Sequence, residues 1–132
     1  MSMRKSVLAV LALGLGLGMA GSVSAATCSN VKINMKNDTP DEIKVTKFEY
    51  EDKGAWKTEN MFGADGHQKI EPGAPNFTWT RDLGGVGGES TKFKATYKHH
   101  SGGTVWGPDK TVTIGPFTCV DNNTDKTLVL NK

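Results

Sequence analysis

The sequence predicts an all-β protein, a single antiparallel β-sandwich of about eight short strands that is immunoglobulin-like or related in architecture. Apolar and polar residues alternate in short runs, and no long apolar pattern has helical spacing. Turn-forming residues separate these runs at intervals of roughly 8–12 residues, as in sandwiches and barrels. Two cysteines, Cys28 and Cys119, fit one disulfide across such a domain.

The first 25 residues have the three parts of a secretory signal peptide. Two basic residues come first, an uncharged apolar run follows over residues 7–20, and small residues end the segment. We expect cleavage after Ala25, with Val23 as the other small residue that the peptidase requires. The apolar run is shorter than the ~20 residues of a membrane-spanning helix. The prediction is an exported bacterial protein, periplasmic or secreted, with residues 26–132 as its sandwich domain.

The charges of the predicted domain are balanced. The full chain has 16 basic and 14 acidic side chains. Arg4 and Lys5 belong to the predicted leader, so 14 residues of each sign remain. Domains that bind nucleic acid through their overall field are strongly basic, and we therefore expect no nucleic-acid partner.

Cys28 and Cys119 predict a structural disulfide, because an even number of cysteines in an exported chain is typical of a disulfide framework. The pair lacks the CxxC spacing of a redox centre. Closing a loop of about 92 residues with a disulfide stabilises the folded state by ~4.6 kcal/mol in the loop-entropy model. Domains of this size are stable by ~5–15 kcal/mol, so the bond would supply a large share.

The strands follow from the alternation of apolar and polar residues. The clearest run is 92–98, where apolar residues alternate with lysine and threonine. Between Val45 and Phe48 the apolar phase shifts by one residue, which predicts a β-bulge. In chain order, the apolar positions of the predicted strands are Val31, Ile33 and Met35; Ile43, Val45, Phe48 and Tyr50; Phe77 and Trp79; Phe93, Ala95 and Tyr97; Val112 and Ile114; Phe117 and Cys119; Leu128 and Leu130.

Turn-forming residues predict the connections between strands. Asp-Gly and Gly-Gly pairs are typical of tight hairpins, and Pro-Gly is typical of a type II turn. The predicted connections are a hairpin at Asp65-Gly66 between 55–61 and 67–71, a type II turn at Glu71-Pro72-Gly73, a hairpin at Ser101-Gly102-Gly103 between 97–100 and 104–106, and a break at Gly115-Pro116. Because each strand has one apolar face, two layers would enclose the core.

The stretch RDLGGVGGEST, residues 81–91, contains four glycines. It does not match a dinucleotide-binding fingerprint, because Ser90 replaces the last glycine and a strand rather than a helix follows. We interpret Gly84–Gly88 as a flexible connector between two strands. Gly85 and Gly87 are then candidate ligand-binding positions in a loop.

The metal-binding candidates are weak. Zinc requires three or four converging ligands, whereas the neighbours His99 and His100 should point to opposite faces of a strand. His67 is the third candidate ligand. Residues 121–125 begin like a calcium-binding loop but lack its glycine and its final glutamate. We expect no cofactor and no dedicated metal site.

Aromatic and basic residues are the stronger binding candidates. Trp56 and Trp106 lie near predicted turns, whereas Trp79 alternates with threonines and should lie in the core. An exposed indole can stack on a sugar, enter a lipid interface or anchor a protein partner. The structural alternative is that each indole only closes one end of the core. The second group is a basic strand face formed by Lys92, Lys94 and Lys98. This face could assist binding or simply be solvated.

The sequence contains neither a nucleophile elbow nor an unpaired cysteine, the two features that would favour covalent catalysis. We predict an exported, non-catalytic binding module that contacts a glycan, lipid or protein through Trp56, Trp106, the glycine stretch and the lysine face. A first alternative is a small cytolysin-like protein that acts on a membrane surface. A weaker alternative is a metal-dependent or glycan-acting enzyme built on the three histidines.

Overall fold

The structure is a computed structural model that describes residues 26–100 and 105–131. Over these residues the chain is all-β and contains no helix, so none is present there that could span a membrane. This confirms the predicted fold class; the predicted leader lies outside the described residues. The strands are β1 (Ala26–Asn37), β2 (Glu42–Asp52), β3 (Ala55–Thr58), β4 (Gln68–Ile70), β5 (Phe77–Gly87), β6 (Ser90–His100), β7 (Lys110–Thr118) and β8 (Asp125–Leu130).

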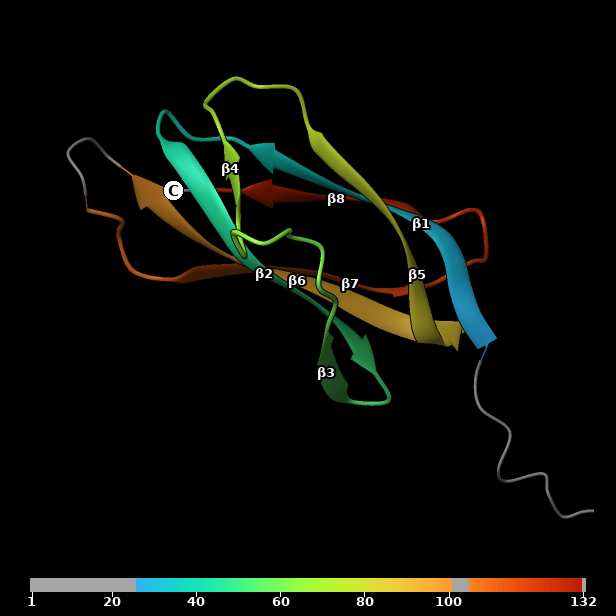
Figure 1. The fold of residues 1–132 in the computed structure, drawn as a ribbon. Coiled ribbons are helices and arrows are strands. Elements are labelled where there is room, and N and C mark those ends of the chain that lie inside the picture. Colours follow the sequence, from blue (N-terminus) through green and yellow to red (C-terminus); the bar gives the residue numbers. More distant parts are fainter. Residues whose placement is uncertain (1–25, 101–104, 132) are drawn as a thin grey trace, which may run out of the picture.

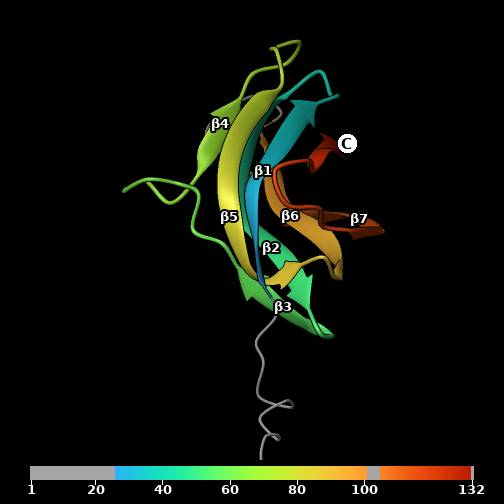
Figure 2. The ribbon, with the colours of Figure 1, turned by 90° about the vertical axis from the view of Figure 1, so that its right-hand side faces the viewer.

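The strands form two sheets that lie as separate layers (Figures 1 and 2). One sheet has the order β5-β1-β8, and the five-stranded sheet has the order β3-β2-β6-β7. The short strands β3 and β4 pair with opposite ends of the same edge of β2 (Figure 1). All neighbours are antiparallel except β1 and β8, which are parallel. This departure from purely antiparallel layers arises because the chain crosses back from β7, in the other sheet, before it forms β8.

The core lies between the two sheets and is built by the inward-facing residues of both. Phe48 of β2 and Phe93 of β6 meet edge to face, with ring centroids 5.1 Å apart. Trp79 of β5 is only 8% exposed and meets Phe62 edge to face at 5.6 Å, which confirms its predicted core position. The largest fully buried apolar side chains are Phe48, Phe93, Ile33, Met35, Ile43, Leu83, Leu128, Leu130, Val31, Val45 and Val86.

The predicted disulfide is present and joins the two layers. Cys28 lies in β1, and Cys119 directly follows β7 of the five-stranded sheet. Their Cα atoms are 6.1 Å apart and both residues are fully buried. The bond therefore fixes one sheet to the other at a point where residues 91 positions apart in sequence meet.

The bulge predicted in β2 is also present. The pairing of β2 with β6 shifts register between Val45 and Lys47. The extra residue is Thr46, whose hydroxyl donates a hydrogen bond to the carbonyl oxygen of Thr96 at 3.3 Å. An inserted residue restores the apolar side chains after it to the buried face, and Phe48 is accordingly fully buried.

Both predicted hairpins are wrong in their strand pairing. β3 and β4 each pair with β2 and not with each other, although Gly66 does sit in a turn with φ +72°. The reason is that the chain between them carries Met61 and Phe62 into the core, where they are 5% and 8% exposed. In the second case residues 105 and 106 form no strand, and residues 101–104 lie outside the described part.

The two proline-containing turns have different outcomes. At Glu71-Pro72-Gly73 the predicted type II turn is confirmed, because Gly73 has φ +72° and the amide of Ala74 donates to the carbonyl of Glu71. The break predicted at Gly115-Pro116 is wrong, since β7 continues through both residues. The register of β6 and β7 shifts there, so the pair is accommodated as an irregularity within the strand.

Candidate ligand-binding face

The polar side chains of the five-stranded sheet gather on the face that points away from the core. Successive residues of a strand point to opposite faces, and along β6 buried residues from Thr91 to His99 alternate with half-buried ones from Lys92 to His100. We call this surface the outer face. It is formed by Glu42, Lys44, Thr46, Lys47, Glu49 and Glu51 of β2, Trp56 and Thr58 of β3, Lys69 of β4, Lys92, Lys94, Thr96, Lys98 and His100 of β6, Thr111 and Thr113 of β7, and Trp106.

Trp56 occupies one end of the outer face. It is half-buried in β3 and pairs with Glu51 of β2. The Nζ atom of Lys94 lies 4.3 Å from the centre of its ring. The same Nζ atom lies 3.6 Å from Oε1 of Glu49, so one lysine contacts both the indole and a carboxylate.

Trp106 occupies the other end, although it belongs to no strand. Its ring lies 4.6 Å from the ring of His100, tilted by 37°. The Nζ atom of Lys44 lies 4.5 Å from the indole centre, and that of Lys69 lies 6.0 Å away. Contacts from β2, β4 and β6 thus hold the half-buried indole against the sheet.

The structure therefore brings the two candidate tryptophans and the three candidate lysines onto one surface. A strand rises ~3.3 Å per residue, so the two ends, marked on β2 by Lys44 and Glu51, are roughly 20 Å apart. Residues Lys44, Lys47 and Lys69 also lie on this surface and are not among the residues singled out from the sequence. The alternation of apolar and polar residues could have identified Lys44 as a residue of this face, because it stands between the buried Ile43 and Val45.

The lysines of the outer face differ in their partners. Lys98 forms an ion pair with Asp109 at 2.8 Å, and Lys47 lies 3.9 Å from Glu49. Lys92 has no carboxylate partner among the residues that the structure describes, and neither has Lys44. The outer face therefore carries ammonium groups that are neutralised by carboxylates and others that are not.

A pair of carboxyl groups, Glu42 and Glu71, lies at the same end of the outer face as His100 and Trp106. A hydrogen bond with Glu42 raises the pKa of Glu71, and desolvation and the charge of Glu42 raise that pKa further, while Lys69 opposes them. The Nδ1 atom of His100 lies 3.9 Å from Oε1 of Glu42. Acidification therefore reduces the negative charge next to Trp106.

The glycine stretch is not the connector expected from the sequence. β5 continues to Gly87, so only Gly88 and Glu89 link it to β6. At Gly85 φ is +84°, and a Cβ atom there would lie 2.6 Å from Oδ2 of Asp52. At Gly87 a Cβ atom would lie 2.8 Å from two backbone carbonyl oxygens of β1. Both glycines lie in the sheet formed by β5, β1 and β8, where close packing excludes a side chain, and not on the outer face.

The three histidines do not converge. His99 is 8% exposed, and its Nε2 atom donates to the carbonyl of Asn131 at 3.1 Å. His100 points to the outer face, as expected for the next residue of a strand. His67 contacts the carbonyl of Asp65 through Nδ1. Over residues 26–100 and 105–131, no three histidine, cysteine, aspartate or glutamate side chains are grouped so that they could hold a metal ion.

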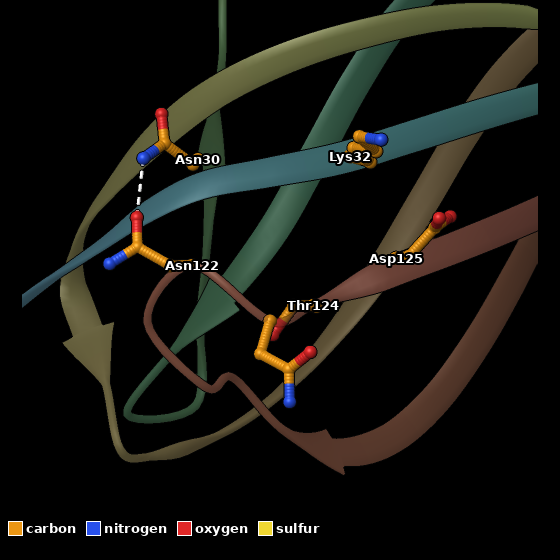
Figure 3. Close-up of a pocket in the computed structure, with 6 residues that line it drawn as sticks. Asn30, Lys32, Asn122, Thr124 and Asp125 are labelled. Carbon is orange, nitrogen blue, oxygen red and sulfur yellow. Dashed lines mark hydrogen bonds between the residues drawn. The ribbon is translucent and has the colours of Figure 1, made fainter.

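A polar pocket of about 160 Å³ lies where β1 meets the turn before β8, and residues 122–125 line it together with Asn30 and Lys32 (Figure 3). Asn30 donates a hydrogen bond from Nδ2 to Oδ1 of Asn122, and both residues have positive φ, 54° and 60°. The acidic residues of the calcium-loop-like stretch 121–125 accept hydrogen bonds from β1. Asp121 accepts from the Ser29 amide at 2.7 Å, and Asp125 accepts from the Asn34 side chain at 2.6 Å.

No protein-family model, curated protein or solved structure matches the chain.

Proposed function

We propose that the protein is a non-catalytic binding module and that the outer face is its ligand-binding surface. The observation that carries this proposal is the placement of Trp56 and Trp106. They are 50 positions apart in the sequence, and Trp56 lies in β3 whereas Trp106 lies in no strand. Both nevertheless lie on one sheet face, with a lysine ammonium over each ring. Indoles on a protein surface are enriched among the side chains that anchor a ligand or partner.

The packing of these two residues argues against a merely structural role at the ends of the core. Neither Trp56 nor Trp106 belongs to the buried hydrophobic cluster or to the half-buried residues packed against it. Trp79, by contrast, is a member of that cluster. Removing either outer indole should therefore cost much less stability than removing Trp79, because no core cavity would form.

A membrane-acting role is the second candidate, and one observation favours it. Val105, directly before Trp106, is 77% exposed. An apolar residue next to an indole can enter a lipid interface. The contacts of Trp106 with Lys44 and His100 favour the sheet face instead, because they hold the indole against polar residues.

The test is a glycan and lipid array probed with the protein expressed with its own leader, followed by Trp56→Ala and Trp106→Ala. Each variant should bind the selected ligand at least tenfold more weakly, with an unchanged circular dichroism spectrum and thermal midpoint. Phe77→Ala is the matched control, because Phe77 is a 37% exposed aromatic residue on the other sheet. Unfolding of both tryptophan variants, or equal weakening by the control, would remove the outer face as the binding surface.

A vesicle assay separates the second candidate from the first. If the protein floats with phosphatidylglycerol or phosphatidylcholine vesicles and releases a trapped dye, the membrane-acting role replaces the binding module. We expect neither flotation nor leakage, because the outer face presents lysine, threonine and glutamate between its two indoles.

A further inference from the structure

We infer that the ligand of the outer face is a linear acidic polysaccharide, with sugar rings against Trp56 and Trp106 and its anionic groups at the lysines beside them. The inference rests on the proposed function, because it names the ligand class of the same surface. Four features of that surface support it: a repeated pair of side chains, the polar residues between the two pairs, the distance that separates the pairs, and the distribution of charge.

The repeated feature is an indole with an ammonium group over it. Lys94 stands over Trp56 at 4.3 Å, and Lys44 stands over Trp106 at 4.5 Å. A sugar ring has an apolar face that packs on an indole, and an acidic sugar carries an anionic group at the ring's edge. One such unit can therefore satisfy both members of the pair. An exposed cation–π contact is worth only ~0.5–1 kcal/mol, so Lys44 can turn from the ring to the anion. Lys94 can do the same by exchanging its contact with Glu49, 3.6 Å away, for a contact with the anion.

The surface between the two pairs is polar throughout. Along β2 and β6 it presents hydroxyl, ammonium and carboxylate groups, among them Thr96, Lys98 and Glu49. Sugar hydroxyl groups both donate and accept hydrogen bonds, so they suit carboxylates and ammonium groups alike. An acyl chain or an apolar protein anchor would find no apolar side chain of these two strands on this face.

The distance between the two pairs requires an extended ligand. They lie roughly 20 Å apart along the strands, given a rise of ~3.3 Å per residue. A single sugar cannot reach both, whereas a chain of several sugars can contact both pairs and the polar surface between them. Simultaneous contact at both ends raises the apparent affinity, because the second contact is intramolecular.

The charge distribution favours an acidic polysaccharide over a nucleic acid. Lys44 and Lys92 have no carboxylate partner among the described residues, so an anion can bind them without displacing one. However, Glu42, Glu49 and Glu51 lie among the lysines of β2 and β6. These carboxylates repel the anionic groups of either polymer, but they also accept hydrogen bonds from sugar hydroxyl groups, which the backbone of a deoxynucleotide strand lacks. Arginine, the residue most suited to phosphate, is absent from the outer-face residues.

Four probes at matched monomer concentration test the inference: sodium alginate, dextran, a single-stranded deoxythymidine oligonucleotide and phosphatidylglycerol vesicles. Binding is followed by the intrinsic tryptophan fluorescence of the full-length expressed protein and by affinity electrophoresis. Alginate should bind at least tenfold more tightly than dextran and the oligonucleotide. Its binding should weaken as sodium chloride is raised, since screening reduces attraction between exposed charges.

The variants Lys44→Met and Lys94→Met, combined, keep the aliphatic stems and remove the two charges. They should weaken alginate binding at least tenfold and leave the thermal midpoint within a few degrees. Lys36→Met is the matched control, because Lys36 is an exposed lysine of β1, in the other sheet. Its binding should match that of the unaltered protein.

The outcomes separate this inference from the proposed function. Equal binding of dextran and alginate, lost in Trp56→Ala, would overturn the acidic class and leave the outer face as the binding surface. Preferential binding of the oligonucleotide or vesicles through the outer face would overturn the polysaccharide class. Alginate binding that neither the tryptophan nor the lysine variants reduce would remove the outer face itself, and with it both proposals. An absence of alginate binding overturns the inference, while the array decides the proposed function.

Discussion

Lys94 and Trp56 contact each other across a strand that lies between them. Lys94 is in β6 and Trp56 is in β3, and in the sheet β2 separates the two. The lysine side chain passes over β2, where Glu49 lies 3.6 Å from its Nζ atom, and ends 4.3 Å from the indole centre. This contact connects the short edge strand β3 to the centre of the sheet.

A double-mutant cycle measures this contact. Lys94→Met and Trp56→Ala, alone and combined, should give a coupling free energy of unfolding of about 0.5–1 kcal/mol, the range for an exposed cation–π pair. Urea unfolding followed by circular dichroism provides the four values. Pairing Trp56→Ala with Lys36→Met should give no coupling, because Lys36 lies in the other sheet. Zero coupling between Lys94 and Trp56 as well would mean that the contact of the lysine with the indole contributes nothing to stability.

Loss of the disulfide should strongly destabilise the protein. Replacing Cys28 and Cys119 by serine removes a crosslink between the two sheets that spans 91 positions. Removing such a bond from a small exported domain typically costs about 2–5 kcal/mol. Guanidinium unfolding of the serine variant, compared with the oxidised protein, measures the loss. An unchanged midpoint would mean that the sheets are held together by their core alone.

Gly87→Ala should destabilise the fold, because the new Cβ atom would lie 2.8 Å from the carbonyl oxygens of Ala26 and Thr27. Backbone atoms cannot move aside cheaply, and crowding of this kind costs about 1–3 kcal/mol. Gly63→Ala is the matched control, since nothing lies within 4 Å of its Cβ position and φ is ordinary there. Thermal unfolding of both variants decides the point. A stable Gly87→Ala variant that fails to bind ligand would instead make this segment part of the binding site.

Gly85→Ala should also destabilise the fold, for two separate reasons. Its φ of +84° disfavours any side chain, and its Cβ atom would lie 2.6 Å from Oδ2 of Asp52. Adding Asp52→Ala to Gly85→Ala should recover the part of the loss that comes from the clash. No recovery would assign the whole loss to the backbone conformation.

Glu71→Gln should stabilise the protein at neutral pH and less so in acid. The pKa of Glu71 is raised in the fold, first by its hydrogen bond with Glu42, so the folded protein disfavours the ionised form. A raised carboxyl pKa means that the folded state binds the proton more tightly than the unfolded state, and the stability contribution of Glu71 increases as pH falls through its pKa.

The gain from Glu71→Gln should therefore be full above the raised pKa and shrink as pH falls towards 4.5, the ordinary glutamate value. Thermal midpoints between pH 4 and pH 8 show this trend directly. A gain that grows in acid would contradict the assigned direction of the shift.

Local patterns in the sequence predicted the strands well. Alternation identified the buried faces of β1, β2 and β6 and a bulge between Val45 and Phe48, and the Pro-Gly pair identified the type II turn at Gly73, since each depends on neighbouring residues. It failed at the link between β3 and β4, where Asp65-Gly66 forms a turn but both strands pair with β2. Which strands pair depends on where Met61 and Phe62 are buried, and no local pattern contains that information.

The candidate site, like the fold, was predicted from the sequence only in part. The sequence by itself identified Trp56 and Trp106 as binding candidates near turns and the lysines of residues 92–98 as a basic strand face, and it determined the all-β class and the cysteine pair. Only the tertiary structure decided that both indoles share one sheet face with Lys44 and Lys94, and that Gly85 and Gly87 lie inside a strand of the other sheet. The physical reason is that side-chain alternation is a property of one strand, whereas contacts between strands are set by how the whole apolar surface is buried.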